Sequence, residues 1–289
     1  MFVRYLLGSK GHEELLRDFI NAHLIDSGFD PVEKVTIENP FNLQEFQNDK
    51  QSILDVRAEA KDKRIINVEI QTSRQIFYIR RSLYYWARLY QSQLKEGESY
   101  EALCAVICIN ILDFTIFEAL KQPHSCFVVT EKSHPGYLLT RDLQFHFYEI
   151  PKYLQKLPFS GRLDKWACFF QCEGDAEKED IMEVLVKEDP VFGRVHQKYI
   201  DFSEDKKMRL AYEAREKKRR DELFMITSAE KRGEERGEKR GEKRGEKRGE
   251  KRGIKKGLSQ AAREMKLSGM AAERIQQFTG LSRAEIDDL

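Results

Sequence analysis

The 289-residue chain is 40% hydrophobic and 34% charged, which allows one main globular domain with a highly charged extension. Its net charge is only +1, although residues 231–256 alone carry thirteen basic and six acidic side chains, a local net charge of +7. The rest of the chain therefore carries −6, which excludes bulk positive charge as a reason to expect nucleic-acid binding by the globular part.

The cysteine content and the lengths of the apolar runs indicate the cellular compartment of the protein. Five cysteines, an odd number without the spacing of a secreted disulfide framework, predict a reducing environment. The start, MFVRYLLGSKGHEELL, has an apolar patch that is too short and too charged for a secretory signal. The longest apolar run, residues 102–112, is well short of the roughly 20 residues of a membrane span. We therefore expect a cytoplasmic protein that does not contact a membrane.

Hydrophobic periodicity predicts strands and helices that alternate along most of the chain. The expected elements are a helix over 11–24, a short strand and turn over 31–40, two strands within 52–71, a helix over 76–94, strands over 103–112, 126–130 and 144–150, and helices over 165–172, 177–187 and 206–226. The run over 103–112 is apolar almost throughout, which suits a strand buried on both faces. This order of elements predicts an α/β fold.

The stretch SILDVRAEAKDKRIINVEIQ, residues 52–71, reads as a hairpin that carries acids on one face. If residues 61–63 form a three-residue loop, the numbers of paired residues add up to 124, and Asp55 lies opposite Glu69. Carboxylates on directly paired residues, about 5 Å apart, repel each other unless a cation lies between them or one is protonated. A divalent cation with oxygen ligands, Mg²⁺ or Mn²⁺, would meet that need. The alternative is an ordinary solvated sheet face with alternating acids.

The expected helix over 76–94 combines aromatic with basic side chains. Arg74, Arg80, Arg81 and Arg88 lie in or beside it, where they could contact phosphates or merely cover a solvated surface. Its aromatic residues are expected in the core rather than as platforms for bases: Tyr84, Tyr85, Trp86 and Tyr90.

From residue 233 to residue 257 a glycine recurs every four residues, with Glu-Lys-Arg between most of them. In a helix each glycine costs about 1 kcal/mol relative to alanine, and this period places like charges four residues apart. The sequence therefore predicts a flexible basic linker, and glycine-mediated self-association into a homo-oligomer is the alternative. We expect a main domain over 1–205, a charged helix and GEKR repeat over 206–257, and a small helical module over 258–289.

The C-terminal module regains helical periodicity. Gly280 predicts a helix end, and Ser282 with Glu285 three residues later predicts a capping box at the next helix. Its expected apolar face consists of Ala262, Met265, Met270, Ile275, Phe278, Leu281 and Ile286. The small helices around this turn resemble a helix-turn-helix, so DNA contact is one interpretation, and docking or oligomerisation is the other.

Five segments in order carry a family resemblance: LLGSKGHEELLRDFINAHL, ILDVRAEAKDKRIINVEIQ, RRSLYYWARLYQSQLKEGESYEAL, INILDF and FYEIPKY, followed by the Gly-Glu-Lys repeat. In these segments the chain resembles the Rpn family of recombination-promoting nucleases, also called PD-(D/E)XK nuclease family transposases. The resemblance covers essentially the whole chain. It implies a PD-(D/E)XK, restriction-endonuclease-like core with a mixed central sheet flanked by helices.

The resemblance also implies an active site in the hairpin. Asp55 matches the first acid of the motif and Glu69 the second, so these carboxylates and the backbone carbonyl of Ile70 would hold Mg²⁺ or Mn²⁺. Gln71 takes the position of the lysine; its amide can hydrogen-bond water but carries no charge and cannot act as a base. The expected catalytic residues are therefore Asp55, Glu69 and Gln71.

The same resemblance points to DNA as the partner. Arg81 matches an arginine that the family places just before a Tyr-Tyr block, and Arg74 and Arg80 lie on nearby turns as further expected DNA contacts. Two functions remain open at this point. One is a metal-dependent DNA endonuclease whose cuts promote recombination, and the other is a degenerate nuclease fold that serves as a DNA-binding or assembly module.

Overall fold

The computed structural model describes residues 2–41, 56–154 and 157–289. The chain divides into two compact units, residues 1–215 and 216–289. Within the described ranges, no helix is both long and apolar enough to cross a bilayer.

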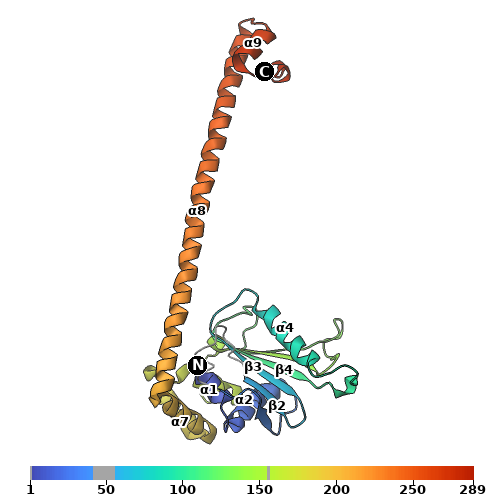
Figure 1. Ribbon diagram of the computed structural model, residues 1–289, viewed down its shortest axis with the longest axis vertical. Helices are drawn as coiled ribbons and strands as arrows, with labels where there is room; N and C mark the ends of the chain where they lie inside the picture. The colour runs from blue at the N-terminus through green and yellow to red at the C-terminus, as the bar shows by residue number, and fades with distance from the viewer. Residues whose placement is uncertain (1, 42–55, 155–156) are drawn as a thin grey trace. The chain divides into compact units, whose positions relative to one another are not determined.

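The first unit is built on a mixed six-stranded sheet with the order β1-β2-β3-β4-β6-β5 (Figure 1). The strands are β1 (Val35–Ile37), β2 (Val56–Ala60), β3 (Ile65–Gln71), β4 (Val106–Leu112), β5 (His124–Phe127) and β6 (Leu143–Glu149). The pairs β1–β2, β2–β3 and β5–β6 are antiparallel, whereas β3–β4 and β4–β6 are parallel. This mixed sheet confirms the predicted α/β class and is consistent with a PD-(D/E)XK fold.

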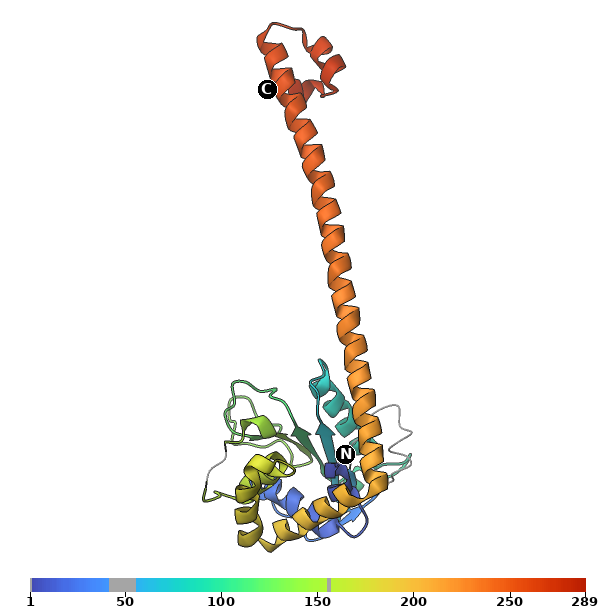
Figure 2. The ribbon, with the colours of Figure 1, turned by 90° about the vertical axis from the view of Figure 1, so that its left-hand side faces the viewer.

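Helices cover both faces of this sheet. The described helices are α1 (Phe2–Gly8), α2 (Glu13–Asp26), α4 (Tyr78–Gln91), α5 (Arg162–Cys172), α6 (Glu179–Glu188), α7 (Pro190–Glu204) and the first part of α8 (Lys206–Leu267), with short 3₁₀ helices η1 (Tyr100–Ala102), η2 (Ile150–Lys152) and η3 (Ala176–Lys178). Helix α4 lies on one side of the sheet, and α1, α2 and α5 to α7 lie on the other side (Figure 2).

The alternation of side chains along β3 separates two cores. Ile66, Val68 and Ile70 belong to the larger core, with Leu16 of α2 and Trp166 of α5 among its buried residues. The smaller core lies under α4. Its buried members are Ile65, Tyr78, Val106, Cys108, Leu112, Phe145 and Phe147. Since successive strand residues point to opposite faces, Asn67, Glu69 and Gln71 face the α4 side, as the sequence predicts.

The hairpin has the predicted register over its described part. Val56 pairs with Val68 and Glu59 with Ile65, so the numbers of paired residues add up to 124. The loop closes through a hydrogen bond from the Lys63 amide to the Ala60 carbonyl, 2.9 Å long, and Lys63 adopts a φ of 68°. Asp55 lies outside the described residues.

Strand β5 and helix α7 differ from the sequence expectation. Strand β5 begins at His124 and ends at Phe127, earlier than the predicted run over 126–130. Helix α7 was not predicted, although its start carries clear signals: Asp189 accepts a hydrogen bond from the Val191 amide, and Pro190 occupies the first turn. Its buried residues Phe192, Val195 and Phe202 recur at helical spacing, and the helix packs against α1 and α6.

The glycine-repeat tract also differs from expectation, because it lies within the continuous helix α8 instead of a flexible linker. All residues from 231 to 257 are exposed. The glycine cost is offset in part by helix-favouring Glu, Lys and Arg. In addition, each lysine precedes the next glutamate by three residues, as Lys239 and Glu242 do, so opposite charges neighbour each other on the helix surface.

The second unit ends in the small helical module. Helices α9 (Ala272–Thr279) and α10 (Arg283–Asp287) pack with the end of α8 around a small core of Ala262, Ile275, Leu281 and Ile286. The capping box of Ser282 and Glu285 and the left-handed Gly280 are both confirmed. Phe278, expected on the apolar face, is 66% exposed, since Ile275 and Thr279 are the residues of α9 that point inward. DNA contact by this module stays a prediction.

Candidate functional site

The candidate site is centred on Glu69, a carboxylate buried in the central strand β3. Glu69 is 4% exposed. Its Oε2 atom lies 3.4 Å from the Tyr78 hydroxyl and 3.6 Å from Nη2 of Arg81, both on α4. Its Oε1 atom is buried and receives no hydrogen bond from any described residue. Burial raises the pKa of the Glu69 carboxyl, and the nearby Arg81 charge and Tyr78 hydroxyl oppose the shift only in part.

A buried polar network supports Glu69 from the neighbouring strand. Asn110 of β4 is the parallel partner of Glu69, and its Oδ1 atom accepts hydrogen bonds from Tyr78 at 2.7 Å and from Ser82 at 3.2 Å. Its Nδ2 atom donates to the His146 carbonyl at 3.1 Å. A phenol carries one proton, so the shorter bond to Asn110 fixes the Tyr78 ring and the contact with Glu69 is the weaker one.

Sequence reasoning missed this network. Its signal was a single amide, Asn110, within the apolar run VICINIL of β4. A polar side chain in a strand that is buried on both faces needs hydrogen-bond partners, and these came from α4.

Gln71 and Arg81, which were expected to have separate roles, lie in direct contact. Nη2 of Arg81 donates a 2.9 Å hydrogen bond to Oε1 of Gln71, and Nη1 donates a 2.6 Å bond to Oε1 of Gln75. The guanidinium also lies over the Tyr78 ring, 5.1 Å from its centroid. A permanent positive charge is therefore held beside the position where the motif would have a lysine.

The other two arginines expected to contact DNA do not contact Glu69 or Gln71 in the described part of the structure. Arg74 and Arg80 are exposed, and the Arg80 guanidinium lies 5.6 Å from the Phe77 ring centroid. Of the aromatic residues expected in the core, Trp86 and Tyr90 stack on each other at 5.0 Å and pack against the α4 core. The expectation is wrong for Tyr84, which is 62% exposed because its position on α4 faces away from the sheet.

Glu69 offers one buried carboxylate oxygen that a divalent cation could bind. A buried carboxylate with an oxygen that lacks a donor is satisfied when a cation approaches it. The described residues alone contain no cluster of three His, Cys, Asp or Glu side chains arranged to hold a metal. Asp55, the expected second carboxylate, lies outside the described residues. Cys168 and Cys172 have buried sulfurs 3.7 Å apart within α5.

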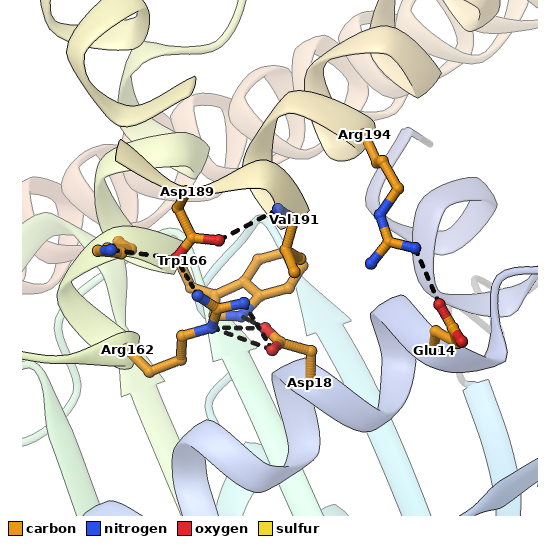
Figure 3. Close-up of polar contacts among 8 residues, drawn as sticks. Glu14, Asp18, Arg162, Trp166, Asp189, Val191 and Arg194 are labelled. Atoms are coloured by element: carbon orange, nitrogen blue, oxygen red, sulfur yellow. Dashed lines mark hydrogen bonds and ion pairs between the residues drawn. The ribbon is translucent and has the colours of Figure 1, made fainter. Parts of the chain in front are cut away.

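Two acids of α2, Glu14 and Asp18, are engaged in structural contacts on the other side of the sheet (Figure 3). Asp18 receives hydrogen bonds from the guanidinium of Arg162, at 2.6 to 3.0 Å, and from the Trp166 indole at 2.9 Å. Arg162 also pairs with Asp189, which caps α7. Glu14 pairs with Arg194 at 2.8 Å on the surface. These acids tie helices together and do not extend the Glu69 cluster.

A comparison of the sequence with known protein families gives a match. A model of the PD-(D/E)XK nuclease family transposases matches residues 2–229. The chain belongs to this family. No curated protein and no solved structure gives a match. Membership in the PD-(D/E)XK nuclease family transposases implies nuclease chemistry on DNA with a divalent metal. The assignment of Glu69 and Gln71 of β3 to the second acid and the lysine position of the family motif stays a prediction.

Proposed function

We propose that the protein is an endonuclease that hydrolyses DNA phosphodiesters with Mg²⁺ or Mn²⁺ in the cytoplasm, and that its cuts promote recombination, as the Rpn resemblance implies. The observation that carries this proposal is the buried Glu69 carboxylate with one oxygen unsatisfied by described residues, beside Gln71 and Arg81. Such a carboxylate is unfavourable for stability by itself, which is common where a group serves function.

Three groups would hold the cation: the carboxylates of Asp55 and Glu69 and the backbone carbonyl of Ile70. Asp55 directly precedes Val56, the first described residue of the hairpin, and enters the proposal from the sequence motif alone. When bound, the divalent ion would supply positive charge against the negative charge that develops on the phosphate.

The described side chains have complementary roles in this proposal. The amide of Gln71 would orient water near the scissile phosphate, because it can donate and accept hydrogen bonds but cannot take up a proton at neutral pH. Arg81 would bind the phosphate with its two-pronged guanidinium. Tyr78 and Asn110 act as positioning residues, since their bond fixes the α4 surface against Glu69. Arg74 and Arg80 are proposed as further DNA contacts, and the C-terminal tail as a means of homo-oligomerisation or added DNA affinity.

Cleavage of supercoiled plasmid at low salt tests this function. Wild type, Asp55→Ala and Glu69→Gln would be compared under Mg²⁺, Mn²⁺, Ca²⁺ and EDTA, with Glu14→Gln as a matched control because Glu14 is an exposed acid on α2. We expect wild type and Glu14→Gln to nick or linearise the plasmid with Mg²⁺ or Mn²⁺, and the other two variants to leave it intact. If Asp55→Ala and Glu69→Gln cleave the plasmid as fast as wild type does, the nuclease activity belongs to another site. Binding of DNA without cleavage by any of them would favour the binding or assembly module.

A further inference from the structure

The outer surface of α4 has an unusual composition for an exposed helix. Between Glu69 and Glu96 the chain has no acidic residue, while Arg74, Arg80, Arg81 and Arg88 all fall in this interval. Exposed helices ordinarily mix both signs of charge. This segment therefore forms a locally positive surface on a unit that is otherwise acidic overall.

Aromatic side chains lie between the arginines on the same face of the helix. Residues three, four, seven and eleven positions apart share a helix face. By this rule one continuous line, here called the α4 stripe, is formed by Phe77, Arg80, Arg81, Tyr84 and Arg88. Phe77 is 64% exposed and Tyr84 is 62% exposed, so both rings present large areas to solvent.

The stripe leads directly to the candidate site. Arg81 belongs to it and at the same time bonds Gln71 and lies 3.6 Å from Glu69. Phe77 is next to Tyr78, whose hydroxyl faces Glu69 and Asn110. The stripe therefore meets the candidate site at Arg81.

We propose that the α4 stripe binds an unpaired stretch of DNA, with bases stacked on Phe77 and Tyr84 and phosphates bound by Arg80 and Arg88. Alternating aromatic and cationic side chains are the usual means of holding single strands, because every base has a face that stacks on a ring. In a duplex the base faces are already stacked and the aromatic rings would have nothing to bind. This inference deepens the proposed function by naming the form of its substrate, and only the cleavage step depends on that function.

Charge argues against a second copy of this chain as the occupant. In a two-fold interface the same surface meets itself, so the arginines of one stripe would face the arginines of the other. No acidic residue between Glu69 and Glu96 could neutralise them. A DNA single strand suits both kinds of side chain, because its phosphates bind the arginines and its unpaired bases stack on the aromatic rings.

The test is fluorescence anisotropy in EDTA, where no cleavage interferes. The probes are a labelled single strand of about 16 nucleotides and the duplex of the same sequence. Wild type is expected to bind the single strand more tightly than the duplex at equal salt. Phe77→Ala and Tyr84→Ala should each weaken single-strand binding by about 5- to 100-fold, whereas Tyr84→Phe should retain it. Arg80→Gln should lower the salt slope of single-strand binding by about 0.7.

The matched control is Tyr137→Ala, which removes an exposed tyrosine outside α4 and should leave both affinities unchanged. Thermal unfolding would verify that the variants stay folded, as expected for exposed side chains. Unchanged single-strand affinity in Phe77→Ala and Tyr84→Ala overturns the proposal, whether or not the plasmid is cut. A change of oligomeric state in these variants would also overturn it, because the surface would then be a protein interface.

Discussion

Arg81 and Gln71 are joined by a 2.9 Å hydrogen bond, which brings a guanidinium from α4 to the residue of β3 that is predicted to occupy the lysine position of the family motif. The charge that Gln71 lacks is thus present in the cluster, supplied by a residue ten positions later in the chain.

Removal of the Arg81 charge should impair cleavage far more than it impairs DNA binding. We expect Arg81→Gln to lower the single-turnover cleavage rate by about 10²- to 10³-fold, the usual loss when one group that stabilises developing charge is removed. Arg81→Lys keeps the charge but lacks the planar guanidinium whose two terminal nitrogens bond Gln71 and Gln75, so its loss should be smaller than that of Arg81→Gln. In Arg81→Gln, the further change Gln71→Lys should restore part of the rate. Equal rates for wild type and Arg81→Gln would exclude Arg81 from the reaction.

Replacement of Glu69 should stabilise the metal-free protein. Because burial raises the pKa of Glu69, the folded state holds a proton that the unfolded state releases, and stability falls as pH rises through that range. Glu69→Gln removes this effect, so its free energy of unfolding at pH 7 in EDTA should exceed that of wild type by about 1 kcal/mol. The advantage should vanish at pH values below the ordinary pKa of a glutamate.

A comparison of wild type with Glu69→Gln also measures metal binding without an activity assay. Addition of Mg²⁺ or Mn²⁺ should raise the Tm of wild type, since a ligand that binds only the folded state stabilises it. Glu69→Gln should show a much smaller rise. An equal rise in both proteins would place the metal at another site.

A buried histidine cluster should make the first unit sensitive to acid. His146 bonds His124 at 3.0 Å, His124 bonds Asp26 at 2.6 Å, and His23 packs against both rings. Burial, and the neighbouring His124, lower the pKa of His146 to about 3. Between pH 6.5 and 3 the unfolded state binds a proton that the folded state does not, so stability falls as pH falls.

At pH 5 this effect of His146 amounts to about 2 kcal/mol relative to pH 7. We expect His146→Gln to reduce the pH dependence of the unfolding free energy between pH 7 and pH 5 by that amount, measured by urea denaturation. His134→Gln is the control, because His134 lies 81% exposed in solvent. The same pH dependence in wild type and His146→Gln would contradict this assignment.

Arg162 should contribute far more to stability than a surface arginine on the same side of the sheet. It binds Asp18 through two nitrogens and also pairs with Asp189, and all three side chains are largely shielded from solvent (Figure 3). Arg162→Leu leaves two shielded carboxylates without their main partner and should cost about 3 kcal/mol. Arg194→Leu breaks only the exposed pair with Glu14 and should cost under about 1 kcal/mol. Similar losses in both variants, measured by urea denaturation, would argue against the network.

Much of the local structure follows from the sequence alone. The three-residue loop predicted the register of the hairpin, and the two-residue alternation agrees with it, because a shift by one residue would turn its apolar side chains to the opposite face. The Ser282 capping box follows from four neighbouring residues. The assignment of Glu69 and Gln71 to the family motif also came from spacing and resemblance, and it stays a prediction.

The tertiary structure decided which polar groups meet. Arg81, Tyr78 and Asn110 reach Glu69 only because α4 packs over β3 and β4, a contact between segments that no local pattern fixes. It also decided that Tyr84 faces solvent, since helical periodicity identifies faces but does not say which one the sheet covers. The sequence thus determined the strands and the caps, which depend on neighbouring residues. Long-range packing determined the environment of Glu69, because desolvation and charge depend on every segment that surrounds a group.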